Sequence, residues 1–157
     1  QRRYIVIADH MVAAGRLGRK AGAGWYRYPA TGGKLVDPSV EDLICEESAV
    51  AGINRRVFTE TEIQHRLVLA MVNEATDILA DGIAQNAADI DLVTIHGYGF
   101  PRWRGGLMYY ADQIGVSDIL RHLRALADED PLVWRPSPVI VDCAEKHISL
   151  AAWHRAE

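Results

Sequence analysis

Cysteine, paired histidines and long apolar runs are all scarce in this chain of 157 residues. The two cysteines, Cys45 and Cys143, lie far apart and form no CxxC pair, so neither a disulfide scaffold nor a zinc site is expected. We interpret them as reduced thiols of a cytoplasmic protein, since the sequence also has no cleavable signal pattern. No apolar run approaches the roughly 18–20 residues that span a bilayer, which predicts no membrane span.

The net charge and the absence of known motifs exclude further classes of function. The formal net charge of −4 gives no broad attraction to phosphate backbones, so nucleic acid is not expected as a partner. The six histidines stand singly, without HxxxH or HExxH, and no metal site is expected. No serine lies in a GxSxG setting. The sequence therefore predicts no catalytic residue and no residue that binds a cofactor or a metal.

Glycines and cations gather in GRLGRKAGAGWYRY, residues 15–28. Backbone N–H groups there, beside Arg16, Arg19 and Lys20, could hold the phosphates of a nucleotide or of coenzyme A. The segment lacks the GK[ST] end of a phosphate-binding loop and is not a G-x-G-x-x-G turn between a strand and a helix. Sharp turns and close backbone packing explain the glycines better. Arg16, Arg19 and Lys20 remain the candidate substrate-binding residues.

Helical signals fill most of the remaining chain. Apolar spacing over 3–14 indicates an opening helix, and Asp37-Pro38 begins a second one that continues to about Val50. Thr59 and Glu62 form a capping box for the longest helix, which ends near Gly82. Further helices are expected over 86–97, 107–114, 117–126 and from Pro138 onward, and a small hairpin is expected to pair 25–28 with 34–36.

Three polar residues have expected structural roles. Ser117 and Ser137 are each interpreted as helix caps. Asn73, in the middle of the longest helix, is expected to link helices through its amide, in preference to contacting a ligand.

Five stretches, taken in order, resemble the second C-terminal repeat of the 3-hydroxyacyl-CoA dehydrogenase in multifunctional fatty-acid β-oxidation enzymes, which combine it with an enoyl-CoA hydratase. They are GRLGRKAGAGWYRY (15–28), IQHRLVLAMVNEA (63–75), GIAQNAADIDLV (82–93), GYGFPRWRGGLMYYADQIG (97–115) and WRPSPVI (134–140). The resemblance implies an all-α fold of the 6-phosphogluconate dehydrogenase C-terminal-like type. Residues 1–36 would be the tail of a preceding repeat with a glycine-rich connector and hairpin, and 37–157 the helical domain.

The resemblance also implies a function. The whole enzyme would oxidise a (3S)-3-hydroxyacyl-CoA with NAD⁺, while the dinucleotide fingerprint and the catalytic His and Glu would lie in a Rossmann domain with no counterpart here. The family's first repeat has an Asn-Arg pair whose Asn meets the substrate, and this chain has His65-Arg66 there. We therefore expect a chain that is inactive alone, binds no cofactor and supports the acyl-CoA cleft. Its expected partners are the Rossmann domain and the first repeat, with a homodimer as a further option.

Two other functions stay open. The cations among the glycines suit a stand-alone module that binds CoA or acyl-CoA. A pure protein-interaction module is the second alternative, and it would carry an exposed apolar face that a partner covers.

Overall fold

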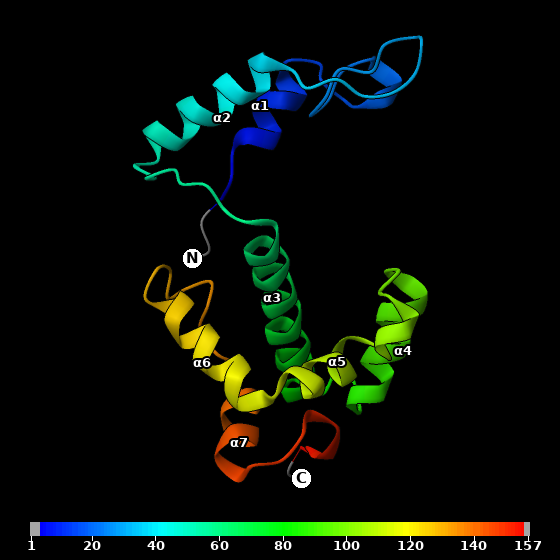
Figure 1. Cartoon of the computed structure of the whole chain (residues 1–157), viewed down its shortest axis with the longest axis vertical. Helices are drawn as coiled ribbons and strands as arrows, with labels where there is room; N and C mark the ends of the chain where they lie inside the picture. The colour runs from blue at the N-terminus through cyan, green and yellow to red at the C-terminus, as the bar shows by residue number, and fades with distance from the viewer. Residues whose placement is uncertain (1–3, 156–157) are drawn as a thin grey trace. The chain divides into compact units, whose positions relative to one another are not determined.

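The computed structural model describes residues 4–155 and divides the chain into two units, one up to Val57 and one from Phe58 onward. Within the described residues every regular element is an α-helix or a short 3₁₀ turn (Figure 1). The all-α prediction is therefore confirmed. The boundary between the units lies about 20 residues after the predicted domain start at Asp37, because α2 packs with α1.

The first unit contains α1 (Ile7–Ala13), the 3₁₀ turn η1 (Arg19–Ala21) and α2 (Pro38–Val50). The carboxylate of Asp37 accepts a hydrogen bond from the backbone N–H of Ser39 at 3.2 Å, so α2 begins at the predicted cap. The opening helix is shorter than predicted. Tyr4 and Ile5 precede its first turn and are exposed, while Met11 is its buried residue.

The predicted hairpin exists at a single residue pair. Arg27 and Leu35 exchange two backbone hydrogen bonds of 2.9 Å each, and Gly32 and Gly33 turn the chain between them with φ of 91° and 84°. No longer ladder forms, because the residues on both sides of Arg27 bond to the glycine-rich segment: Gly24 N–H donates to the carbonyl of Tyr26, and Tyr28 N–H donates to the carbonyl of Gly22.

The second unit holds the other five helices. Figure 1 shows α3 as its central helix, with α4 and α6 on opposite sides. Their bounds are α3 Glu60–Ala80, α4 Ala87–Gly97, α5 Leu107–Ile114, α6 Val116–Ala127 and α7 Pro138–Lys146, with 3₁₀ turns η2 Arg102–Arg104 and η3 Leu150–Ala152. Thr59 and Asn86 accept the backbone N–H three residues ahead, so α3 and α4 begin at their predicted caps.

One apolar core joins these helices. Helix α3 packs on α5 and α7, α4 packs on α5, and α6 packs on α5 and α7. The largest fully buried apolar side chains are Leu69, Val72, Met108, Ile119, Leu123, Val139, Ile140 and Leu150. Burying each of them stabilises the fold by roughly 1.5–3 kcal/mol relative to exposure. The core thus brings together residues that are up to 81 positions apart, from Leu69 to Leu150.

Asn73 links α3 to the start of α7, as predicted. Its amide nitrogen donates to the carbonyl of Arg135 at 2.9 Å, and its amide oxygen accepts the backbone N–H of Ser137 at 2.8 Å. Both residues at this contact, Asn73 and Ser137, are buried, so these bonds satisfy groups that water does not reach.

The two serine caps are predicted only in part: Ser137 occupies the N-cap position of α7, whereas Ser117 does not cap a helix. Ser137 immediately precedes α7, but its hydroxyl accepts no capping bond, because the side chain is fully buried where Asn73 binds the backbone. Ser117 lies inside α6, whose first residue is Val116 and whose preceding residue is Gly115. The glycine breaks α5 from α6 by adopting φ of 98°, so no side chain caps α6.

Candidate functional site

Helix α3 presents apolar side chains on two faces. Leu69, Val72 and Leu79 point into the core and are at most 2% exposed. A second row at four-residue spacing, Ile63, Leu67 and Met71, is on average half exposed. A helix that is apolar on two faces requires a second covering element.

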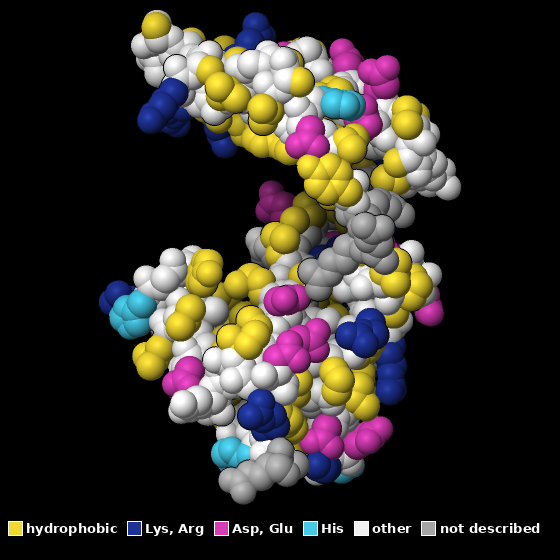
Figure 2. Space-filling model, turned by 180° about the vertical axis from the view of Figure 1, so that it is seen from behind, with side chains coloured by type: hydrophobic (Ala, Val, Ile, Leu, Met, Phe, Trp, Pro, Cys, Tyr) yellow, Lys and Arg dark blue, Asp and Glu magenta, His cyan; other side chains and the backbone are white. Residues whose placement is uncertain are grey.

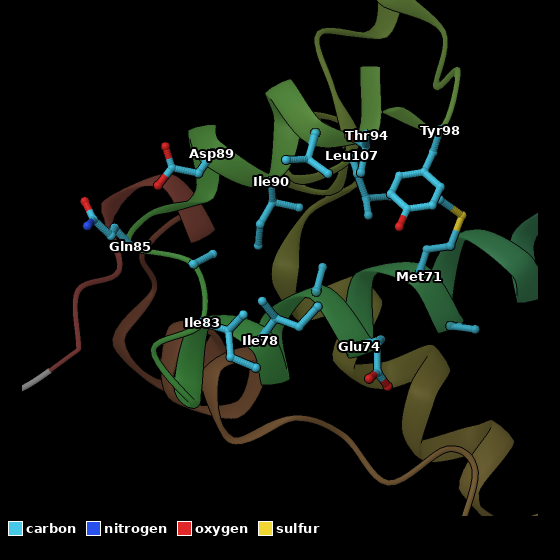
Figure 3. Close-up of a pocket in the computed structure, with 14 residues that line it drawn as sticks. Met71, Glu74, Ile78, Ile83, Gln85, Asp89, Ile90, Thr94, Tyr98 and Leu107 are labelled. Carbon is cyan, nitrogen blue, oxygen red and sulfur yellow. The ribbon is translucent and has the colours of Figure 1, made fainter. Parts of the chain in front are cut away.

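The exposed face of α3 continues into an apolar groove of about 850 Å³ between α3, α4 and the loop that joins them (Figure 3). Ile90 and Leu107 form its floor and are buried. Ile83 and Tyr98 are 75% and 79% exposed on its walls. Figure 2 shows that hydrophobic side chains also reach the surface elsewhere, but they lie among charged ones. This groove is therefore the candidate functional site, because it joins exposed apolar side chains in one concave surface.

Half-buried Asp91 fixes α4 against α5, beside the groove. Its carboxylate accepts the backbone N–H of Met108 at 2.6 Å and that of Tyr109 at 3.3 Å. These N–H groups belong to the first turn of α5, whose own preceding residue, Gly106, has no side chain to cap them. Burial raises the pKa of Asp91, although the two backbone bonds oppose that shift. Asp91, a residue of α4, therefore caps the N-terminus of α5.

The charges at the groove are few and of one sign. Glu74 and Asp89 lie at its edges, and no Lys or Arg of the described part of the chain lines it (Figure 3). The phosphates of CoA would therefore meet carboxylates instead of cations here. The groove suits the apolar side chains of a protein surface better than a polyanionic ligand.

Arg16, the first of the predicted substrate-binding residues, is held by the first unit itself. Its guanidinium donates to the carbonyl of Gly24 at 2.9 Å and to the carboxylate of Asp37 at 2.7 Å. The hydrogen bonds that Arg16 and Ser39 donate to the carboxylate of Asp37 hold its pKa below its usual range. Arg16 thus ties the glycine-rich segment to the start of α2. The arrangement needs glycine, because a Cβ on Gly24 would lie 2.7 Å from the Cα of Gly18.

Arg19 and Lys20, the other two predicted residues, are exposed on η1. The Arg19 guanidinium lies 5.3 Å from the ring centroid of Tyr28. Both cations are accessible to a ligand, whereas Arg16 already has partners within the chain. The three residues therefore share a segment, but they do not converge on one cavity of the described chain.

The described residues contain no cluster of metal ligands, and the buried thiol of Cys143 is not reactive. In that part of the chain no three His, Cys, Asp or Glu side chains gather as a metal site. Cys143 is fully buried, and burial raises the pKa of its thiol to about 11, which disfavours the reactive thiolate. No helix among residues 4–155 is long and apolar enough to cross a membrane.

Sequence reasoning missed the groove. Its walls come from α3, α4 and their connecting loop, which are contiguous in sequence, so a signal was available. Ile83, in the connecting loop, and Val93, on α4, are apolar, and both are more than half exposed. Apolar residues on a second face of an amphipathic helix indicate a further contact surface.

The sequence of this chain is similar to those of several known proteins. Residues 63–148 match the family described as 3-hydroxyacyl-CoA dehydrogenase, C-terminal domain. The chain is 39% identical over 145 residues to the peroxisomal bifunctional enzyme of Danio rerio, covering 88% of this chain and 20% of that protein. It is 38% identical over 131 residues to the Cavia porcellus protein of that name, covering 82% and 18%.

A plant relative is similar along more of the chain. The peroxisomal fatty acid beta-oxidation multifunctional protein of Oryza sativa subsp. japonica is 32% identical over 150 residues, covering 93% of this chain and 21% of that protein. The chain thus spans about a fifth of the length of the curated relatives that it matches.

Proposed function

Because the chain belongs to the 3-hydroxyacyl-CoA dehydrogenase C-terminal domain family, we propose that it is the helical packing part of an NAD-dependent (3S)-3-hydroxyacyl-CoA dehydrogenase of fatty-acid β-oxidation. The relatives it matches are named for bifunctional or β-oxidation multifunctional proteins. In this proposal the reacting groups and the NAD site lie in a Rossmann domain of the same enzyme. This chain helps to shape the acyl-CoA cleft by supporting the first helical repeat.

The apolar groove between α3 and α4 is the observation that supports this proposal. A concave surface of this size with Ile83, Val93 and Tyr98 exposed on it is costly to leave in water, so a covering surface is expected. A helix of the first repeat supplies apolar side chains without the phosphates that Glu74 and Asp89 would repel. A homodimer through the same surface is the alternative use of the groove.

Charge placed in the groove is expected to weaken this packing. We would mix the chain with the Danio rerio enzyme truncated before the matched segment and follow complex formation by size-exclusion chromatography. Replacing Ile83 and Val93 together by aspartate should weaken the complex at least about tenfold, because two carboxylates would lose water without gaining partners. Both positions are more than half exposed, so the fold itself should be retained.

Leu132→Asp is the matched control, since Leu132 is 64% exposed in the same unit and does not line the groove. It should leave the complex within about twofold of the unchanged chain. Turnover of acetoacetyl-CoA with NADH by the isolated chain would contradict the proposal, because it would place the reacting groups here.

Binding of CoA by residues 15–36 is a second proposal. These residues contain the cations Arg16, Arg19, Lys20, Arg27 and Lys34 and no acidic residue. Backbone N–H groups near them could complete a phosphate site.

Calorimetry with CoA tests this second function. Binding in the micromolar range that weakens with salt is expected, and Arg19→Ala with Lys20→Ala should lower the affinity at least about tenfold. Arg16 is left unchanged because it holds Asp37. Arg121→Ala, on the other unit, is the control. Equal affinity of the double variant and the unchanged chain would exclude these cations as the site.

The location in the cell is also a proposal. Two cysteines free of disulfides suit a reducing compartment, which supports the cytoplasm. The named relatives are peroxisomal, so the peroxisome is the competing location.

A further inference from the structure

A second cavity, separate from the groove, lies between the start of α3, the turn η2 and α5, all in the second unit. Its volume is about 400 Å³, within the size range of small-molecule sites. Val68, Phe100 and Ile114 supply apolar walls, and each is packed against the core. Polar groups line the same space from Gln64, His65 and Arg104.

Among the described residues, Arg104 is the one charged side chain of the cavity apart from the titratable imidazole of His65. Its guanidinium carbon lies 4.3 Å from the ring centroid of Trp103 and 4.3 Å from that of Tyr110. Stacking on rings orients the planar guanidinium but leaves its in-plane N–H donors unused. Among the described residues no carboxylate forms an ion pair with Arg104 and no carbonyl accepts from it. A fixed cation with unused donors therefore faces an apolar space.

His65 adds hydrogen-bonding capacity without a second charge. Its ring meets that of His122 edge to face, with centroids 4.5 Å apart and planes at 76°. Burial lowers the pKa of His65, and the neighbouring His122 lowers it further. The imidazole is therefore neutral near pH 7, where it supplies one N–H donor and one acceptor.

We propose that this cavity binds a small monocarboxylate with a compact apolar body. The carboxylate pairs with the two parallel N–H donors of Arg104, and the apolar body lies on Val68, Phe100 and Ile114. Gln64 and His65 hydrogen-bond the polar end. One fixed cation matches one negative charge, which selects against polyanions such as CoA. No acidic side chain of residues 4–155 lines the cavity, in contrast to the groove between α3 and α4.

Three matched probes test the ligand class on the whole chain by NMR titration of the imidazole protons of His65. Benzoate carries the charge and the apolar ring, benzamide keeps the ring without the charge, and acetate keeps the charge without the ring. Benzoate should bind saturably, and each of the other two at least about tenfold more weakly. Equal binding of all three, or no saturation by benzoate at millimolar concentration, would overturn the proposal.

Variants of two neighbouring arginines test the site. Arg104→Gln should weaken benzoate binding at least about tenfold, because it removes the charge and the paired donors. Arg102 lies on the same turn and does not line the cavity, so Arg102→Gln should stay within about twofold. Equal losses in the two variants would contradict the proposal. Should Arg104→Gln unfold, Arg104→Lys takes its place: it keeps the charge without the fork, and intermediate affinity is expected.

Discussion

Replacing Gly106 by alanine is expected to lower the free energy of unfolding by about 3–5 kcal/mol, which combines backbone strain and overpacking. Gly106 has φ of 110° and ψ of 171°, a region that residues with a Cβ essentially avoid. A Cβ there would lie 2.4 Å from the Cβ and Cγ of Asp91. Asp91 cannot move aside without releasing the N–H of Met108. Urea unfolding followed by circular dichroism measures the loss.

Gly99→Ala is the matched control for this variant. Gly99 also has positive φ, 72°, but a Cβ there would meet no heavy atom within 4 Å. The expected loss is about 1–2 kcal/mol, since only the left-handed backbone is strained. Similar losses in both variants would show that backbone conformation alone matters, and that the close approach of α4 to α5 does not.

Asn73→Ala is expected to cost about 2–4 kcal/mol, because it leaves two buried backbone groups without partners. Its amide nitrogen now serves the carbonyl of Arg135, and its oxygen serves the N–H of Ser137. Loss of both also removes the polar link between α3 and the start of α7. Thermal and urea unfolding of the purified chain give the difference in stability.

Asn86→Ala provides the comparison for Asn73. Asn86 caps α4 at the exposed surface through one bond of 3.0 Å to the N–H of Asp89. Water can replace that bond, so a loss of about 1 kcal/mol is expected. A cost for Asn73→Ala no larger than that for Asn86→Ala would mean that water reaches the α3–α7 junction.

Local signals made the helices predictable. The side chains of Asp37, Thr59 and Asn86 each accept a backbone N–H two or three residues ahead. Both partners of each bond therefore lie within one short sequence motif. The role of Asn73 was predictable because a buried amide in the middle of a helix needs hydrogen-bond partners. The identity of those partners was not predictable, because they lie 62 and 64 positions away in the sequence.

Long-range geometry accounts for what sequence reasoning missed. Ser137 has the pattern of a cap, but Asn73 occupies its surroundings from another helix. Asp91 caps α5 from 17 positions away, which no helix-start pattern contains. The second cavity was missed because Arg104, on η2, and His65, on α3, line the same space only once the helices have packed.

The contact from Asp91 to Met108 also bears on how the second unit opens. The carboxylate of Asp91 on α4 accepts the N–H of Met108 in the first turn of α5, so this N–H loses its acceptor whenever α4 detaches. Fraying of the two helices is therefore linked, and their amides should exchange with solvent as one cooperative element instead of as two. A partner that clamps α4 would slow exchange in α5 without touching it.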